Sequence, residues 1–353
     1  MTGSPVRVPY ERLHAFATAA FAAAGVRPAH AEITAHRLLE ADLRGRDGHG
    51  IIRATLYVKR MRAGAYNLDP TIRIERESPV SALVDGDNGV GQVVMTRAVE
   101  IAIEKALAGG MAWVGVLNGN HAGAGGVYPA LALPHDLIGI YMAVGNANTM
   151  PPWGGLDELL GTNPLTVAIP AGEEPAIQLD IATTMTSHGT IKVMALEGRT
   201  LPEGWVVDRE GNPITDPARV GEGFLLPIGG HKGFGLNLVI GMLAGVLNGA
   251  AFGADVIDHR FDHTTPTNSG QAFFAMRPDL FRDLDEFKAD MDRHIRAFLA
   301  STPMPDRTIR LPGHNAARLE AENRRLGVPL KTALHADLQA LADELELDDR
   351  LDL

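Results

Sequence analysis

Apolar residues recur at helical spacing along both ends of this 353-residue chain, whereas its middle carries short β-like runs mixed with helical stretches. The expected helices cover Tyr10–Ala24, Ala29–Arg44, a segment from about Ile52, Asp285–Leu299, Ala316–Arg325 and a tail whose apolar stripe is Leu334, Leu338, Leu341 and Leu345. The expected strands cover Ile72–Ile74, Val80–Val84, Trp113–Leu117, Leu137–Val144, Leu165–Ile169 and Ala272–Met276. Helical ends around a sheet-bearing middle indicate a mixed α+β chain.

Two apolar stretches could be confused with membrane segments. Leu13–Val26 is similar to the apolar part of a secretory signal, but its helical spacing and the inclusion of His14 favour a helix of the mature protein. Phe234–Phe252 is nearly long enough to span a bilayer, but Asn237, Asn248 and four glycines interrupt it. We therefore expect a buried helix here and no association with a membrane.

Charge and cysteine content exclude several classes of function. The chain has 32 Lys and Arg against 43 Asp and Glu, a formal net charge of -11, which argues against a general nucleic-acid or anionic-membrane surface. An anionic ligand would need a local basic site. The chain contains no cysteine, so disulfides, thiolate zinc sites and a cysteine nucleophile are excluded, and a reducing cytoplasm is the expected location.

Two histidines lie in glycine-rich loops, where chemistry is expected. His49 follows Asp47 in the segment 44–53, between two expected helices, and His121 lies in the segment 118–126, directly after an expected strand. Glycine lets a ligand approach the backbone closely, and imidazole exchanges protons near neutral pH. The alternative is that each histidine only caps a neighbouring helix.

Recognised dinucleotide and nucleotide motifs are missing. The glycines around Gly123 do not have the G-x-G-x-x-G spacing, and the cluster around Lys232 lacks the spacing and the Ser or Thr of a Walker loop. Polar segments beside apolar runs, at 151–165, 180–189 and 227–235, nevertheless place hydroxyls and amides where a phosphate or ribose could bind. Ordinary capping and turn formation is the alternative for each segment.

Several motifs in order make the chain resemble the malate/L-lactate dehydrogenase family, which is unrelated to Rossmann-type lactate dehydrogenases. The match runs from about Glu11 to about Val328. The motifs are Asp47-Gly-His49-Gly with Arg53, Asn120-His121, Met150-Pro-Pro-Trp-Gly-Gly155, Gly161-Thr-Asn-Pro164, Asp180-Ile-Ala-Thr183, Pro202-Glu-Gly-Trp205 and Lys232-Gly-Phe-Gly235.

The resemblance implies a fold and an assembly. It implies a non-Rossmann NAD(P)-binding α/β domain with a mixed sheet, which we assign to residues 76–279, and a helical domain built from residues 1–75 together with 280–353. It also implies a homodimer. The cofactor would be NAD or NADP, between which the sequence does not choose.

The resemblance further implies roles for individual residues. His49 would be the proton donor and acceptor, and His121 and Arg53 would lie near the substrate, together with Asn120, Thr162 and Asn163. The dinucleotide would contact Asp180, Ile181, Ala182, Thr183, Thr184, Thr186, His231, Lys232, Gly313 and His314. The chain departs from the family pattern at Gly48 and Gly119, which replace usual serines, at Ala122, which replaces a bulky residue, and at Thr190, which replaces a usual lysine. Lost hydroxyls imply altered substrate contacts.

The main hypothesis is hydride transfer between nicotinamide and C2 of a small 2-oxo or 2-hydroxy carboxylate, such as malate, lactate or diketogulonate. Protonated His49 would stabilise and then protonate the carbonyl oxygen, and Asp47 would orient the imidazole or raise its pKa. His121 would supply a second hydrogen bond. Arg53 would clamp the carboxylate, with Arg44 and Arg46 as weaker candidates.

Three alternatives remain at this point. The first is reduction of a cyclic imine carboxylate, which arrives protonated and needs a proton donor less. The second is a metal-dependent hydrolase that uses His49, His121, Asp47 and Asp180, although no recognised metal motif supports it. The pair His259 and His263 has ligand spacing, but its polar surroundings predict a solvated face. The third is a ligand-binding relative without catalytic activity.

Overall fold

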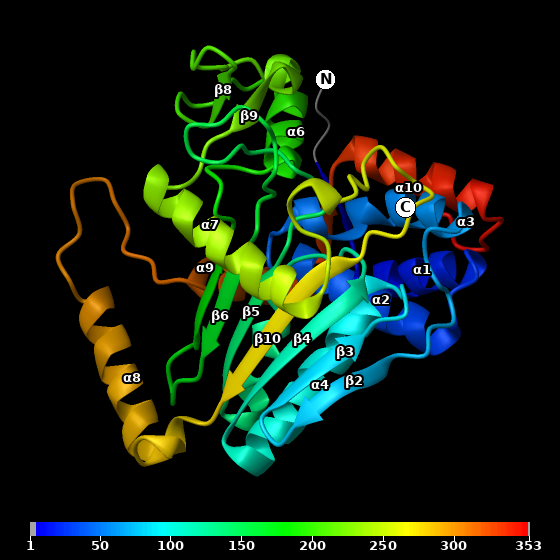
Figure 1. Cartoon of the computed structure of the whole chain (residues 1–353). Helices are drawn as coiled ribbons and strands as arrows, with labels where there is room; N and C mark the ends of the chain where they lie inside the picture. Colours follow the sequence, from blue (N-terminus) through cyan, green and yellow to red (C-terminus); the bar gives the residue numbers. More distant parts are fainter. Residues whose placement is uncertain (1–4, 352–353) are drawn as a thin grey trace.

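The central element of the computed structural model, which describes residues 5–351, is a seven-stranded sheet with the order β2-β3-β4-β10-β5-β6-β7 (Figure 1). The strands are β2 (Arg73–Ser78), β3 (Ser81–Asp85), β4 (Met111–Gly119), β10 (Ser269–Met276), β5 (Ile138–Ala143), β6 (Leu165–Ile169) and β7 (Ile177–Ile181). Strands β3 and β4 are parallel, and every other neighbouring pair is antiparallel. The predicted mixed sheet is confirmed, although the sequence analysis missed the edge strand β7.

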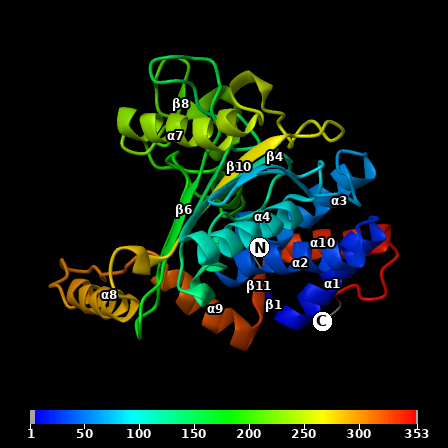
Figure 2. The same ribbon diagram turned by 60° about the horizontal axis from the view of Figure 1, so that its bottom comes forward.

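Helices cover both faces of this sheet. Helix α4 (Gly91–Gly109) packs on one face, in the hydrophobic cluster that contains Phe273 of β10. Helix α7 (His231–Ala244) packs in a second cluster that contains the adjacent residue Ala272. Because successive side chains of a strand point to opposite faces, the two helices lie on opposite sides of the sheet, as Figure 2 shows.

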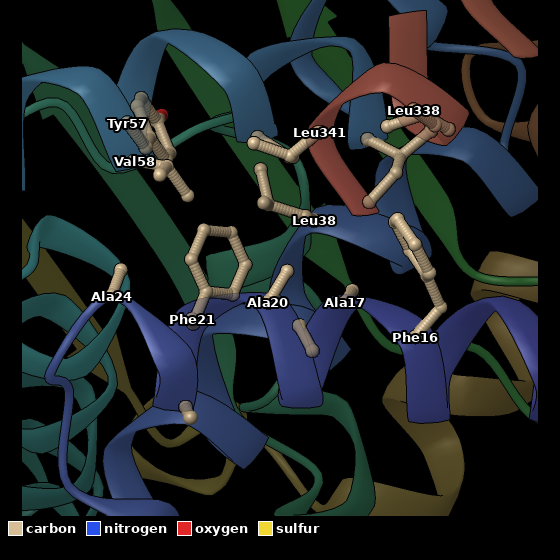
Figure 3. Close-up of a cluster of buried hydrophobic side chains, with 14 of the residues drawn as sticks. Phe16, Ala17, Ala20, Phe21, Ala24, Leu38, Tyr57, Val58, Leu338 and Leu341 are labelled. Atoms are coloured by element: carbon tan, nitrogen blue, oxygen red, sulfur yellow. The ribbon is translucent and has the colours of Figure 1, made fainter. Parts of the chain in front are cut away.

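Segments from both ends of the chain form one further core. It joins α1 (Tyr10–Ala23), α2 (Pro28–Leu43), α3 (Ala54–Arg62), α10 (Thr332–Glu344) and the antiparallel pair β1 (Val6–Val8) with β11 (Val328–Leu330). In Figure 3, Phe16 and Phe21 of α1 face Leu38 of α2 and Leu338 and Leu341 of α10. The expected helices at these positions are confirmed, while the division of the chain into two domains stays a prediction.

The expected helix over 234–252 is only partly correct. Helix α7 ends at Ala244 and is followed by a 3-10 turn at Val246–Asn248, because β10 crosses here so closely that a Cβ on Gly270 would lie 2.2 Å from the Ala244 carbonyl oxygen. The segment is also not buried on all sides. Four apolar side chains are 47% to 62% exposed, namely Val239, Met242, Val246 and Leu247. No helix in residues 5–351 is long and apolar enough to cross a membrane.

The remaining elements lie around the edge of the sheet. Helix α6 (His188–Leu196), strands β8 (Val206–Asp208) and β9 (Gly223–Leu225) and the turn at Pro217–Glu222 form a small unit with its own apolar cluster. Helix α5 (Val127–Ala130) and the turn Leu133–His135 precede β5, and α9 (His314–Leu326) precedes β11. Helix α8 (Leu284–Leu299) lies apart from the terminal core, and its Asp292 accepts hydrogen bonds from three backbone N–H groups at 172–174.

Candidate active site

A cavity of about 350 Å³ lies where the turn between α2 and α3 meets the ends of β4 and β5 and the start of α6. Its wall includes His49, Arg53, His121, Lys192 and Arg260. No aspartate or glutamate of the described residues lines it, although the whole chain carries a net charge of -11. The cavity therefore favours an anionic ligand, as local basic sites do in acidic proteins.

A buried carboxylate shapes the turn that carries His49. Two short 3-10 turns, Asp47–His49 and Ile51–Arg53, join α2 to α3. Asp42 at the end of α2 is 4% exposed and accepts a 2.7 Å hydrogen bond from the Ile51 N–H. Gly50 passes so close to Asp42 that a Cβ there would lie 2.0 Å from the Asp42 Oδ1 atom. Asp42 was not predicted to shape the site, because a single acidic residue in a helical sequence does not indicate which groups it will contact.

His49 is neutral in this cavity. Burial, followed by the positive charges of Arg53 and Arg46, lowers its pKa to about 3. The protonated form expected for the reductive reaction is therefore not the form of His49 in the free protein, and its role during the reaction stays a prediction. The proposed support from Asp47 is absent as well, because the Asp47 side chain is exposed and makes no hydrogen bond to His49.

Three imidazole rings adjoin one another in the cavity. The rings of His49 and His121 are nearly parallel, with an interplanar angle of 12° and centroids 5.8 Å apart. The ring of His259 lies 5.0 Å from that of His121. Burial lowers the pKa of His121 well below its ordinary value and that of His259 to about 3, so both are neutral near pH 7.

The prediction that His259 lies on a solvated face is wrong. His259 is 4% exposed and lines the cavity, and its buried Nδ1 atom has no hydrogen-bond partner in the described part of the chain. Arg60 of α3 holds this loop in place, since its buried guanidinium donates hydrogen bonds to the carbonyl groups of Asp262 and Thr265. The polar sequence around His259 gave no sign that an arginine from a distant helix would draw the loop inward.

Arg53 is the cavity's unpaired guanidinium. Its Nε atom donates a 2.7 Å hydrogen bond to the Gly48 carbonyl, and within residues 5–351 no carboxylate forms an ion pair with it. The other arginines considered for this role are engaged. Arg44 pairs with Glu320 and Arg46 with Asp180, and both line a separate cavity, while Arg260 pairs with Asp258. An unpaired guanidinium is well suited to bind a carboxylate in bidentate fashion.

Two of the predicted substrate residues are enclosed in the structure. Asn120 is fully buried and its amide donates hydrogen bonds to the loop at 88–89, while its Oδ1 accepts one from Thr267. Asn163 is fully buried and bonds to Asn237 and to the Gly145 N–H. Neither lines the cavity, whereas Thr162 does. The two asparagines therefore hold the loops that form the wall.

Several residues predicted to contact the dinucleotide lie between two cavities. Asp180, at the end of β7, and Gly313 line a second cavity of about 160 Å³, and the segment after Asp180 leads to Ser187 in the wall of the first. Thr183 and Thr184 are buried and bonded internally. Ile181 and Ala182 connect Asp180 to these threonines. Two buried atoms, Thr186 Oγ1 and His314 Nε2, have no hydrogen-bond partner in the described residues. His231 and Lys232 are exposed at the start of α7.

The four departures from the family pattern occupy different surroundings. A Cβ on Gly48 would meet only the Gly189 Cα atom, at 3.8 Å, whereas one on Gly119 would lie 2.9 Å from the Ser269 carbonyl oxygen. Ala122 lines the cavity. Thr190 is exposed on α6, and the nearby Lys192, which the sequence analysis missed, lines the cavity instead.

The sequence and the fold of this chain were compared with those of known proteins. The sequence model of the malate/L-lactate dehydrogenase family matches residues 8–339. The chain belongs to this family. Malate dehydrogenase of Pyrococcus horikoshii is 35% identical over 357 residues, covering 97% of this chain and 96% of that protein.

Two solved structures extend the comparison. Sulfolactate dehydrogenase from Methanocaldococcus jannaschii has a TM-score of 0.90 and 35% identity, covering 97% of this chain and 98% of that one. Delta1-piperideine-2-carboxylate reductase from Pseudomonas syringae pvar. tomato has a TM-score of 0.83 and 26% identity, covering 96% and 100%. In residues 5–351, no group of three or more His, Asp or Glu side chains has an arrangement that could hold a metal ion.

Gly48 and Gly119, where the resemblance implies serines, give a matched test. Gly48→Ser has room for its side chain, so we expect a free energy of unfolding within about 0.5 kcal/mol of the original protein and an altered preference among 2-oxo acids. Gly119→Ser meets the backbone of β10 and should destabilise the protein by about 1–3 kcal/mol. Urea unfolding and a substrate panel measure both effects. Equal stability of the two variants would contradict the interpretation.

The neutral histidines also predict a pH dependence of stability. Because the folded pKa values of His49 and His259, about 3, lie below the unfolded value of about 6.5, the unfolded chain binds more protons between these limits. The free energy of unfolding should therefore fall as the pH drops from about 6.5. Urea unfolding at several pH values measures this effect. The free energy of unfolding should fall less with decreasing pH in His49→Gln, and as much as in the original protein in His294→Gln, on the exposed surface of α8.

Proposed function

We propose that this chain transfers a hydride between a nicotinamide dinucleotide and C2 of a small 2-oxo or 2-hydroxy carboxylate. The observation that carries the proposal is the pairing, in one acid-free cavity, of a neutral imidazole at His49 with an unpaired guanidinium at Arg53. The first can exchange the proton of the substrate hydroxyl, and the second can hold the substrate carboxylate.

The residue roles follow from the protonation states. In the oxidative direction neutral His49 accepts the hydroxyl proton, and in the reductive direction it must first gain a proton, which it then gives to the new hydroxyl. Binding of an anionic substrate between Arg53 and His49 favours that gain, because it neutralises the charge that lowers the pKa of His49. His121 supplies a hydrogen bond to the same oxygen. The dinucleotide, when bound, supplies or accepts the hydride.

The second cavity and the segment from Asp180 to Ser187 fit the remainder of the dinucleotide. Two buried polar atoms, Thr186 Oγ1 in this segment and His314 Nε2 next to Gly313 in sequence, have no partner in the part of the chain described, so a polar ligand could satisfy them. Arg44 and Arg46 line this cavity as members of ion pairs, and Lys232, which is exposed at the start of α7, can neutralise a phosphate. We propose a non-Rossmann mode of binding, because the sheet has a single parallel pair of strands in place of a doubly wound parallel order.

The second candidate is reduction of a cyclic imine carboxylate. A neutral His49 favours it, because a protonated imine needs no proton from the protein. A side-by-side assay of 2-oxo acids and Δ1-piperideine-2-carboxylate separates the two reactions. Tight dinucleotide binding with no turnover of any of these substrates would instead support a relative without catalytic activity.

We also propose that two copies of the chain associate. The apolar side chains exposed along α7 and the turn after it support this assembly, because monomers seldom leave several large apolar residues together in water. A second copy of the chain would cover them.

The reaction is tested with two single-residue variants. His49→Ala should bind NADH or NADPH with nearly unchanged affinity in a fluorescence titration but turn over at least ~100-fold more slowly, since it loses proton transfer. Arg53→Leu should raise KM for the carboxylate, by roughly 10- to 100-fold, because a charged hydrogen bond is lost. Arg62→Leu, an exposed residue at the end of α3, is the control. Wild-type turnover in His49→Ala would refute the assignment.

The assembly is tested by introducing a charge on the exposed apolar side chains. Leu247→Asp places a charge on a side chain that is 62% exposed, so the protein should change from dimer to monomer in light scattering. Phe298→Asp alters an equally accessible apolar side chain on α8, 59% exposed, and should leave the mass unchanged. A monomeric starting protein would exclude the proposal.

A further inference from the structure

A line of hydrogen bonds leads from α4 through α3 to His121. The amide nitrogen of Gln92 donates to the Tyr57 hydroxyl oxygen at 3.3 Å, and the Tyr57 O–H lies 2.5 Å from His121 Nδ1. Both Gln92 and Tyr57 are fully buried. The residues come from three separate parts of the chain, so the line exists only in the folded protein.

The backbone fixes the direction of this line. The Gly123 N–H donates to the same Nδ1 atom at 3.3 Å. A proton on Nδ1 would face this N–H, so the N–H favours an accepting Nδ1, and the much shorter bond from the Tyr57 hydroxyl, which donates to Nδ1, supplies the larger part of that preference. Gly123 has a φ of 77°, a left-handed backbone conformation that favours glycine at this position.

The opposite side of the ring is open to the cavity. His121 lines the cavity wall, and its Nε2 atom has no hydrogen-bond partner in the portion of the chain that the structure describes. A neutral imidazole with an accepting Nδ1 carries its proton on Nε2. His49, which lies stacked beside His121, has no comparable restraint and is free to exchange its proton.

We propose that Tyr57 and Gln92 are positioning residues that hold His121 in the Nε2–H tautomer, so that it donates one hydrogen bond to the reacting oxygen while His49 exchanges the proton. This inference rests on the proposed hydride transfer. The proposal gives the two imidazoles different roles. His121, which is restrained at Nδ1, is a fixed hydrogen-bond donor, and His49 carries the proton.

The close packing around Gln92 explains how the line is maintained. Gly91, at the start of α4, has no room for a side chain, since its Cβ would lie 2.4 Å from the carbonyl oxygens of Asn120 and His121. The start of α4 is therefore pressed against the loop that carries His121. Burial also raises the pKa of Tyr57 above its ordinary value, so the hydroxyl keeps its proton at any pH at which the protein functions.

The direct test is Tyr57→Phe, which removes only the hydroxyl. In protein labelled with 15N-histidine, long-range 1H–15N spectra report which ring nitrogen of His121 is protonated, and a His121→Gln variant assigns the signal. We expect Nε2–H alone in the original protein and a mixture of both tautomers in Tyr57→Phe. The kcat should fall about tenfold, the value of one hydrogen bond, with KM changed less than about threefold.

The pKa of His121 provides a second readout. A donor to Nδ1 stabilises the neutral ring, so its loss should raise the pKa of His121 and shift the acid limb of the kcat profile upward. The groups around His121 that also act on this pKa are His49, His259, Arg53, Arg60 and Tyr57 itself, and all but Tyr57 are unchanged in the variant. A purely structural role for Tyr57 would not move this limb.

Two further variants keep the test decisive. Tyr10→Phe removes a Tyr–His hydrogen bond of the same kind, 2.9 Å to His36 Nδ1, far from the cavity, and should leave kcat unchanged. Gln92→Met serves if Tyr57→Phe does not fold, and should show the same changes at a smaller size. If the tautomer and pKa of His121 are unchanged in Tyr57→Phe, the hydrogen bonds from Gln92 and Tyr57 do not fix the tautomer. If the tautomer changes but kcat does not, the tautomer has no role in catalysis.

Failure of the proposed function gives a different result. If no 2-oxo acid is reduced by the original protein, the hydride-transfer proposal fails. The spectra of His121 are recorded without substrate, so they still decide whether Tyr57 fixes the tautomer.

Discussion

The site depends on keeping imidazole rings out of water beside an uncompensated arginine. Burial penalises the charged form of each ring, and Arg53 penalises it further, so His49, His121 and His259 are neutral. No carboxylate of the described residues lines the cavity to relieve this effect. In the proposed reaction an anionic substrate is the partner of Arg53, and its binding changes the charge balance that determines whether His49 can carry a proton.

Maintaining this environment is the task of buried polar groups behind the wall. Asp42 holds the turn that carries His49, Arg60 holds the loop that carries His259, and Asn163 ties the strand ends to α7. Each of these side chains bonds to backbone groups or to other buried polar groups, as is needed away from water. They make the positions of the cavity side chains a property of the rigid fold.

Local patterns in the sequence predicted most of the secondary structure, because helical and strand periodicities are written in neighbouring residues. The segment Tyr10–Ala23 and the strand Leu165–Ile169 lie where they were expected. The errors have physical causes. Strand β7 is an edge strand whose side chains are all partly exposed, so its pattern is weak, and the apolar run after Phe234 was interrupted by the close crossing of β10 at Gly270.

By itself the sequence determined the family and the mixed character of the fold, and it singled out His49, His121 and Arg53 as candidates, since these rest on residue types at short spacings. Only the tertiary structure decided that His259 and Lys192 join them, that Asn120 and Asn163 lie behind the wall, and that His49 is neutral. Protonation state and burial depend on which distant segments surround a side chain, and the fold alone brings those segments together.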